Sequence, residues 1–321
     1  MKLGVFSVVF GNLRFEAMLE RVREAGLECV EIGTGAYPGS AHCDVEGLLV
    51  DPARLAAYRR AIEAAGLSIS ALSCPGNPLH PNKDIAAEHR RAFERTVRLA
   101  ERLEVPVIVL LSGCPGDSPT AKYPNWCHFA WPPDFVELWN WQWNEVAIPY
   151  WREAAAFASA HGIRRLAVEM HPGFLVYNPE TALKLREAVG ENLGVNFDPS
   201  HLFWSGVDIP TAVHALKDAI FHCHAKDTFV DALNVAKNGC LDGKPYADIS
   251  NRSWSFRTVG WGHGLEVWRS IVSAMRATGY DYVLSIEHED PLASRDEGLR
   301  HAVQFLRQAV FSEPAGDMWW A

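Results

Sequence analysis

Residues 14–26, RFEAMLERVREAG, are followed directly by residues 27–33, LECVEIG, and this pair of segments decides the fold. In the first segment Met18, Leu19 and Val22 recur at the spacing of one helical face, and the final glycine suits a helix end. The second segment is short and mostly apolar, as in a buried strand. The chain therefore contains a unit made of an amphipathic helix, a breaker and an apolar strand.

The same unit recurs along the chain. The later copies are AAYRRAIEAAG with LSISALS (56–73), RRAFERTVRLAERLE with VPVIVLLSG (90–113), WREAAAFASAHG with IRRLAVEM (151–170), ETALKLREAVGEN with LGVNFD (180–198), IPTAVHALKDA with IFHCHAK (209–226), and VWRSIVSAMRATG with YDYVLSIE (267–287). The opening LGVFSVVF adds an eighth strand. Strands that alternate with helices pair in parallel through right-handed crossovers. We therefore predict an α/β fold, a (β/α)8 TIM barrel formed by residues 1–321 as a single domain, with a doubly wound open sheet as the alternative.

Two connections are longer than a barrel needs. One spans roughly residues 113–149 after the fourth strand, and the other spans roughly residues 228–264 after the seventh. Because both follow strands, they would lie at the C-terminal face, where barrel enzymes carry their sites. Long loops in this position are candidates for a lid or an oligomer contact.

The composition limits the classes of partner. A formal charge of −9 argues against a surface for phosphate backbones, so we expect no nucleic acid partner. Seven cysteines form no C-x-x-C pair, and we interpret them as buried, reduced side chains. No signal peptide and no apolar run of about 18 residues is found, so we expect a cytoplasmic protein without membrane contact.

Charged residues follow the apolar strands in the second half of the chain. Alternate residues of a barrel strand point inward, so the inward set can be obtained from parity. In VLSIE the apolar positions would face the helices, which turns Glu287 into the barrel. The same parity in LAVE, VNFD and FHCH directs Glu169, Asp198 and His224 inward. Four successive strands thus bring three carboxylates and one imidazole to one side of the barrel mouth.

Each of these residues has an ordinary structural role when taken alone, such as an ion pair, a turn or a hydrogen-bonded core histidine. Together, Glu169, Asp198, His224 and Glu287 suit one divalent cation, because oxygen ligands dominate and thiolate is absent. We expect Mn²⁺ first, with Co²⁺, Mg²⁺ or Fe²⁺ as alternatives.

Further residues near these strand ends are candidates for substrate contact. They are His171, His201, Lys226, Arg257, His263 and Glu289. His201 could instead cap a helix, His171 could face solvent, and Lys226 could form an ion pair with Asp227, which we favour over direct catalysis. His222 lies one inward layer below His224, and we expect it to pack or to support a ligand.

Five motifs carry a family resemblance. They are VEMHPG (168–173), NFDPSH (196–201), HCHAKDT (222–228), FRTVGWGHG (256–264) and SIEHED (285–290). They resemble the sugar phosphate isomerase/epimerase superfamily with a xylose-isomerase-like TIM barrel, which includes ketose 3-epimerases, inosose dehydratase and, more distantly, endonuclease IV. The resemblance covers nearly the whole chain.

The resemblance implies roles for individual residues. In the epimerases the matching Glu169, Asp198, His224 and Glu287 bind one metal ion, and the two glutamates also act as the catalytic acid/base pair. His201 matches a histidine that contacts a substrate oxygen. The epimerases commonly have an arginine shortly after the histidine of the seventh strand. This chain has Lys226 there, so it would bind its sugar differently.

The activity expected from this resemblance is that of a metal-dependent sugar isomerase or epimerase, which removes a proton next to the carbonyl of a keto sugar or polyol. The first alternative is a lyase or dehydratase that acts by β-elimination, including cleavage of 3-oxo-glycosides as in the C-glycoside deglycosidases. The barrel subunit of those enzymes works with a small second subunit. For this chain we expect a carbohydrate or glycoside substrate and, by analogy, a homo-oligomer.

Two other classes fit less well. A DNA-repair endonuclease of the same barrel would need a multinuclear zinc site with more histidines and a basic groove, and the acidic charge balance argues against it. A sugar-binding barrel without catalysis would not require the full set of ligands.

Tryptophan is concentrated in residues 125–143, NWCHFAWPPDFVELWNWQW. Indole rings stack on the C–H faces of sugars, so a lid over a carbohydrate or glycoside is one interpretation. The others are a buried helix face, since Trp139 and Trp143 are spaced i and i+4, and a subunit interface.

Overall fold

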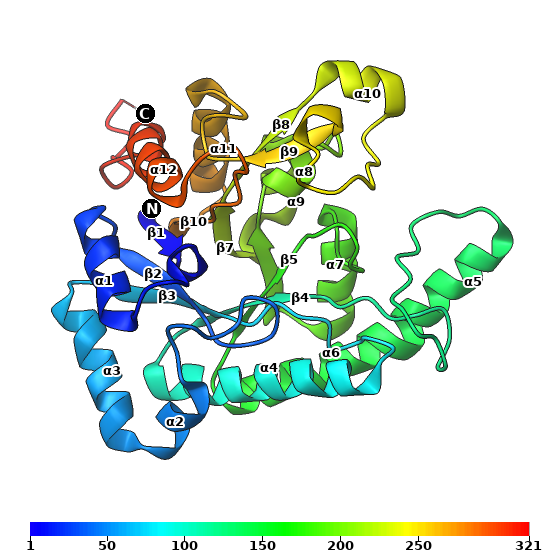
Figure 1. Cartoon of the computed structure of the whole chain (residues 1–321), viewed down its shortest axis with the longest axis horizontal. Helices are drawn as coiled ribbons and strands as arrows, with labels where there is room; N and C mark the ends of the chain where they lie inside the picture. Colours follow the sequence, from blue (N-terminus) through cyan, green and yellow to red (C-terminus); the bar gives the residue numbers. More distant parts are fainter. Residues whose placement is uncertain (321) are drawn as a thin grey trace.

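The structure, a computed structural model, describes residues 1–320 and contains a closed barrel of parallel strands surrounded by helices (Figure 1). The order around the barrel is β1, β10, β7, β6, β5, β4, β3, β2. These strands are β1 (Lys2–Phe6), β2 (Cys29–Gly33), β3 (Ser68–Ser73), β4 (Val107–Leu111), β5 (Arg165–Glu169), β6 (Leu193–Phe197), β7 (Ile220–Ala225) and β10 (Val283–Ile286). The predicted (β/α)8 barrel is confirmed, and the open sheet is wrong because β1 pairs with β10 and closes the ring.

Helices connect the strands, and most of them cover the outside of the barrel. They are α1 (Phe15–Glu24), α2 (Val45–Val50), α3 (Pro52–Ala64), α4 (Lys83–Leu103), α5 (Pro133–Trp141), the π-helix η2 (Gln142–Ala147), α6 (Ile148–Ala160), α7 (Pro179–Val189), α8 (Ser200–Phe203), α9 (Ile209–Leu216), α11 (Leu265–Ala277) and α12 (Arg295–Ala309). Short 3-10 turns occupy η1 (Ser7–Phe10), η3 (Lys217–Ala219) and η4 (Ile249–Asn251). The first unit agrees with its sequence pattern, because Gly26 follows α1 with φ of 69°, a left-handed conformation that favours glycine.

The first strand is shorter than the sequence pattern predicts. LGVFSVVF suggests a strand to Phe10, but β1 ends at Phe6 and Ser7–Phe10 form η1. Val9 and Phe10 are buried in the main core, where η1 packs beside β2. These residues are therefore apolar because they are buried, although the strand has ended.

The core has the two layers that strand parity predicts. Leu166, Val168 and Ile286 belong to the large cluster between the strands and the helices. Ala167 lies in a separate small cluster with Ala71, Val107 and Val109, inside the barrel. The alternation that directs apolar side chains outward therefore directs Glu169 and Glu287 toward the barrel interior, where the candidate site is formed.

The loop after β7 has secondary structure of its own. It contains the antiparallel strands β8 (Asp227–Val230) and β9 (Trp254–Arg257), with α10 (Ala232–Asn238) between them. The sequence pattern predicted a long loop here but not the hairpin. Trp204, Trp254 and Phe256 form an aromatic cluster beneath it, so the loop is anchored by its own small core at the C-terminal face.

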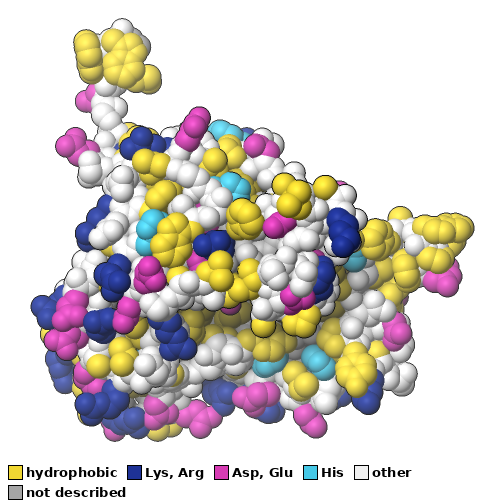
Figure 2. All heavy atoms as spheres, turned by 45° about the horizontal axis from the view of Figure 1, so that its top comes forward, with side chains coloured by type: hydrophobic (Ala, Val, Ile, Leu, Met, Phe, Trp, Pro, Cys, Tyr) yellow, Lys and Arg dark blue, Asp and Glu magenta, His cyan; other side chains and the backbone are white. Residues whose placement is uncertain are grey.

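The long connection after β4 forms an arm that projects from the side of the barrel. It consists of the loop of residues 112–132, α5, η2 and the start of α6, and α5 contains no buried residue (Figure 1). Apolar side chains gather on the projecting part (Figure 2), among them Phe129, Trp131, Phe135 and Val136, which are exposed. Isolated exposed apolar residues are ordinary, but a group of this kind is typical of an interaction surface.

The structure shows the state of the cysteines and the length and hydropathy of the helices. All seven cysteines are free thiols, as expected, and only Cys240 is not buried. None of the helices in residues 1–320 is both long enough and apolar enough to cross a membrane.

Candidate metal centre

The four residues predicted to bind a metal meet at the C-terminal mouth of the barrel. Glu169 ends β5, Asp198 follows β6, His224 lies in β7 and Glu287 follows β10. These four strands are consecutive around the barrel, and one ligand atom from each residue lies within 4.8 Å of the others. The geometry required of a shared cation site is therefore present.

The ring of His224 lies between two sets of carboxylates. Its Nδ1 atom is 3.1 Å from Glu169 Oε2 and 3.2 Å from Glu287 Oε2, and its Nε2 atom is 3.1 Å from both carboxylate oxygens of Glu31. Burial lowers the pKa of His224, but the charges of Glu31 and Glu287 outweigh it and raise that pKa well above its usual value. The surroundings of this ring thus favour a cation, either a proton or a metal ion.

Lys226 supplies the positive charge nearest to the carboxylates. Its ammonium group lies 3.0 Å from Asp198 Oδ2, 2.6 Å from Glu287 Oε2 and 3.0 Å from Glu289 Oε2. Burial lowers its pKa, but these charges raise it well above its usual value, so the side chain stays charged. The prediction that Lys226 pairs with Asp227 is wrong. Successive residues of a strand point to opposite faces, and Lys226 points into the mouth.

The three carboxylates of the predicted ligand set are ionised. Burial raises the pKa of each group, but neighbouring cations outweigh burial. For Asp198 and Glu287 the largest opposing effect is the charge of Lys226, and for Glu169 it is the hydrogen bond with His201. The pKa of all three groups therefore lies below its usual range. Three carboxylates thus converge on a site whose compensating positive charges are Lys226 and the neighbouring histidines His201 and His224.

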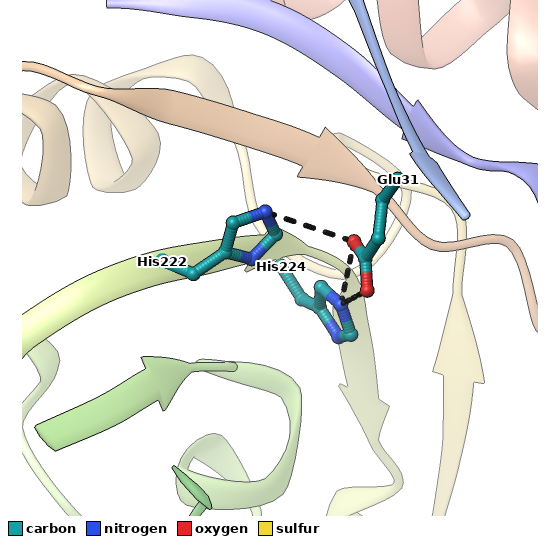
Figure 3. Close-up of side chains that lie close together, drawn as sticks. All are labelled: Glu31, His222 and His224. Carbon is teal, nitrogen blue, oxygen red and sulfur yellow. Dashed lines mark hydrogen bonds and ion pairs between the residues drawn. The ribbon is translucent and has the colours of Figure 1, made fainter. Parts of the chain in front are cut away.

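Glu31 is a buried member of this site that the sequence reasoning missed. It lies in β2 across the barrel and faces His224 (Figure 3). It also accepts hydrogen bonds from the hydroxyl groups of Ser73 and Ser285. Burial raises its pKa, but the charges of His224 and His222 outweigh it and lower the pKa to about 2. The signal was available in CVEIG, where Val30 and Ile32 pack outward and Glu31 has inward parity.

His201 and His171 form one wall of the site. The Nε2 atom of His201 lies 3.2 Å from Glu169 Oε1 and 3.3 Å from Asp198 Oδ2, and its ring stands 4.1 Å from that of His171. Burial lowers the pKa of His201, but the charge of Asp198 outweighs it and raises the pKa to about 9. Burial and the charge of His201 lower the pKa of His171 to about 4. His201 thus contacts two members of the ligand set, and a ring nitrogen of His171 lies within 4.8 Å of ligand atoms of Glu169 and His201.

Arg257 and His263 hold the loop after β7 in place. Arg257 Nε donates to Asp290 at 3.1 Å, and His263 Nδ1 lies 2.7 Å from Asp227 Oδ1 while its ring stacks on Phe203. These contacts give the two side chains structural roles, and their contact with substrate stays a prediction. Glu289, whose side chain is 49% exposed and contacts Lys226, lies at the open side of the site.

Some tryptophans of the arm are buried and others are exposed. Trp143 and Trp151 are buried in the main core, and Lys184 lies over the rings of Trp139 and Trp143. The buried helix face that the i, i+4 spacing predicted is therefore found only in part, because Trp143 is buried and Trp139 is half-buried against the core. Trp131 is 77% exposed on the projecting part, so its role as a lid or as a subunit interface stays a prediction.

A (β/α)8 barrel with acidic and imidazole side chains gathered at the C-terminal mouth has the architecture of the barrel enzymes. The family model described as the xylose isomerase-like TIM barrel matches residues 19–309, and the chain therefore belongs to this family.

Several known proteins are similar to this chain over nearly its whole length. The uncharacterized protein YfiH of Bacillus subtilis is 37% identical over 312 residues, which cover 97% of this chain and 99% of the relative. The structure of L-ribulose 3-epimerase has a TM-score of 0.63 at 17% identity, covering 96% of both chains.

Two further solved structures differ in the reaction that their descriptions give. The 3-keto-D-glucoside 4-epimerase YcjR of E. coli has a TM-score of 0.62 at 14% identity and covers 96% of this chain and 99% of its own. The probable 3-DHS dehydratase AsbF of Bacillus anthracis has a TM-score of 0.65 at 18% identity, with the same coverage. At these identities the likeness concerns the fold.

Proposed function

We propose that the chain is a divalent-metal-dependent enzyme that removes the proton next to the carbonyl group of a keto sugar or related polyol, with an isomer or epimer as product. The observation that carries this proposal is the convergence of Glu169, Asp198, His224 and Glu287, whose ligand atoms lie within 4.8 Å of one another. The expected roles are those of metal ligands for all four residues and of acid/base groups for the two glutamates.

The residues fit a divalent ion on two grounds. Three carboxylates and one imidazole form the donor set, which is typical of Mn²⁺ and related ions. In addition, the buried atoms His224 Nδ1 and Asp198 Oδ2 both face the centre of the cluster, where Nδ1 lies 3.1 Å from Glu169 Oε2 and Oδ2 lies 3.0 Å from Lys226 Nζ. Ligand atoms of all four residues are thus close enough together to contact one ion.

When bound, a divalent ion would act as a Lewis acid that stabilises negative charge developing on a carbonyl oxygen. The protein side chains supply the proton transfers. Glu169 and Glu287 come from strands separated by β6 and β7, so they approach the site from two sides. Asn196 Nδ2 and His201 Nε2 hold the two oxygens of Glu169 at 2.7 and 3.2 Å.

Glu287 is the better candidate for the base. It contacts Lys226 and His224 through Oε2, and among residues 1–320 its Oε1 atom has no hydrogen-bond partner. Lys226 stays charged because of its three carboxylate neighbours. It is therefore suited to bind a substrate oxygen and to keep Glu287 ionised, and it is a poor proton donor.

Elimination is the alternative outcome of the same first step. Loss of a substituent next to the carbanion would give a lyase or dehydratase, including one that cleaves 3-oxo-glycosides. Structures of this fold include both an epimerase of a keto glucoside and a probable dehydratase, so the barrel alone does not decide the outcome.

Metal analysis tests the proposal first. We expect the purified protein to bind about one divalent ion per chain, and we expect a chelator to remove both the ion and the activity, with recovery on addition of Mn²⁺. Elemental analysis and equilibrium binding of Mn²⁺ measure this without knowledge of the substrate. A protein that binds no divalent ion with its ligands intact would overturn the proposal.

The product outcome can be measured in deuterated water with a panel of ketoses and 3-oxo-glycosides. We expect deuterium to enter the carbon next to the carbonyl of an otherwise intact sugar, because the removed proton exchanges with solvent before it returns. Release of the aglycone or of water would instead support elimination. An absence of exchange with every member of the panel, in protein loaded with metal, would count against carbonyl-adjacent proton removal from these substrates.

A further inference from the structure

A buried polar network lies inside the barrel beneath the candidate metal centre. Glu31 of β2 and the two histidines of β7 point toward one another (Figure 3), and the residues are 0% (Glu31), 0% (His222) and 1% (His224) exposed. An ionised carboxylate in a barrel interior is costly unless every acceptor position is satisfied. The network is therefore expected to have a role in positioning the side chains of the metal centre above it.

The hydrogen bonds around Glu31 determine where the proton of His224 lies. Ser73 and Ser285 donate their hydroxyl groups to Glu31, which leaves the carboxylate as an acceptor for its third partner. That partner is His224 Nε2, 3.1 Å from both oxygens. Nε2 consequently carries a hydrogen, and Nδ1 is the ring atom that faces Glu169 and Glu287.

A second branch connects the same network to Glu169. Asn196 Nδ2 donates to Glu169 Oε2 at 2.7 Å, and Asn196 Oδ1 lies 2.9 Å from His222 Nδ1. The other ring nitrogen of His222, Nε2, is 3.8 Å from Glu31 Oε2. Asn196 and His222 therefore support Glu169 from beneath the site, and His222 packs beside Glu31 without a hydrogen bond to it.

We propose that Glu31 is a positioning residue for the metal centre, which fixes the ring orientation of His224 and presents Nδ1 as its ligand atom, while Asn196 and His222 orient Glu169. This inference rests on the proposed function. It goes further by assigning a role to a buried strand residue outside the proposed ligand set, on the far side of the His224 ring from Glu169 and Glu287. Carboxylates that hold a ligand histidine in this way are common in metal sites.

The test replaces Glu31 by glutamine and measures the affinity for Mn²⁺ from the electron paramagnetic resonance signal of the free ion. Glutamine keeps the size of the side chain but removes its charge and places an amide donor near His224. We expect binding roughly 10- to 100-fold weaker than in the unmodified protein. Glu28→Gln is the matched control, because Glu28 directly precedes the same strand and its side chain accepts only from the backbone of Leu3. The affinity of this variant for Mn²⁺ should be unchanged.

The outcomes separate the two proposals. If the unmodified protein binds Mn²⁺ and Glu31→Gln binds it as tightly, the positioning role is overturned and the proposed function stands. If the unmodified protein binds no divalent ion, the proposed function falls and this inference falls with it. A role for Glu31 in stability alone would lower the unfolding temperature of the metal-free variant and leave the affinity for Mn²⁺ unchanged.

A second measurement does not depend on how the variant folds. In the unmodified protein loaded with diamagnetic Zn²⁺, nitrogen-15 NMR of the histidine rings reports which nitrogen of His224 carries the hydrogen. We expect a hydrogen on Nε2 and the metal on Nδ1. A hydrogen on Nδ1 would overturn the proposal, because the ring would then present its other nitrogen.

Discussion

Replacing Glu287 by glutamine is expected to lower the turnover of proton removal by roughly 10²- to 10⁴-fold, the usual contribution of a positioned general base. The side chain keeps its size and its amide oxygen, so the barrel should remain folded. The carboxylate is the part that is lost, and among the described residues its Oε1 atom has no competing partner. Deuterium exchange at the substrate carbon measures this effect directly.

The matched control is Glu289→Gln, two residues further along the chain. Glu289 also contacts Lys226, but its side chain is 49% exposed, so we expect its replacement to change turnover less than about tenfold. Binding of Mn²⁺ must be measured for both variants, because Glu287 is also a proposed ligand. Full turnover in Glu287→Gln, or a larger loss in Glu289→Gln, would contradict the assignment of Glu287 as base.

Glu169→Gln is a less informative experiment, for a reason that the structure supplies. Glu169 accepts from Asn196, faces His201 and also lies near His224. An amide in its place would meet donors on several sides and disturb the network beneath the site. A loss of activity there would not separate proton transfer from the arrangement of the ligands.

The fold could be predicted from the sequence because the spacing of apolar residues indicates which side of each helix or strand is buried. Parity placed Val168 and Ile286 against the helices, and the same alternation directed Glu169 and Glu287 inward. The closed ring followed from the repeated unit of helix and strand. These features depend on local pattern, which a single sequence contains.

Contacts between distant strands are where the sequence reasoning failed. Glu31 and His224 are 193 positions apart, and nothing local to either residue indicates that they meet across the barrel. Asp227 was paired with Lys226 because the two are adjacent, yet their side chains point to opposite faces of the strand. Adjacent charges are a poor guide to ion pairs in a strand.

The largest change in stability that we expect follows from substitution of Asp227. The residue is fully buried where the chain leaves β7, and its two oxygens accept from several donors around it. The donors are the backbone N–H groups of Thr228, Gly260 and His263, the ring of His263 and the indole N–H of Trp268. One carboxylate thus fastens both ends of the long loop to the start of α11.

Replacement of Asp227 by alanine is expected to destabilise the protein by about 3–5 kcal/mol, because buried donors that have lost their acceptor retain the full cost of desolvation. Asparagine keeps one oxygen but places an amide donor against N–H groups, so it should also destabilise, by roughly 1–3 kcal/mol. The midpoint of urea unfolding, followed by tryptophan fluorescence, measures both changes. The order alanine, asparagine, unmodified protein follows from the number of donors left without a partner.

Asp231→Ala provides the control, since Asp231 lies four residues further along the same loop and only caps α10 through the backbone N–H of Asn234. Loss of such a cap costs about 1 kcal/mol. If Asp227→Ala unfolded at the same urea concentration as Asp231→Ala, the loop would not depend on this carboxylate. If Asp227→Ala unfolded at a much lower urea concentration than Asp231→Ala, the stability of the wall beside Lys226 would depend on Asp227, whose side chain faces away from the site. The loop after β7 would then be a structural part of the barrel.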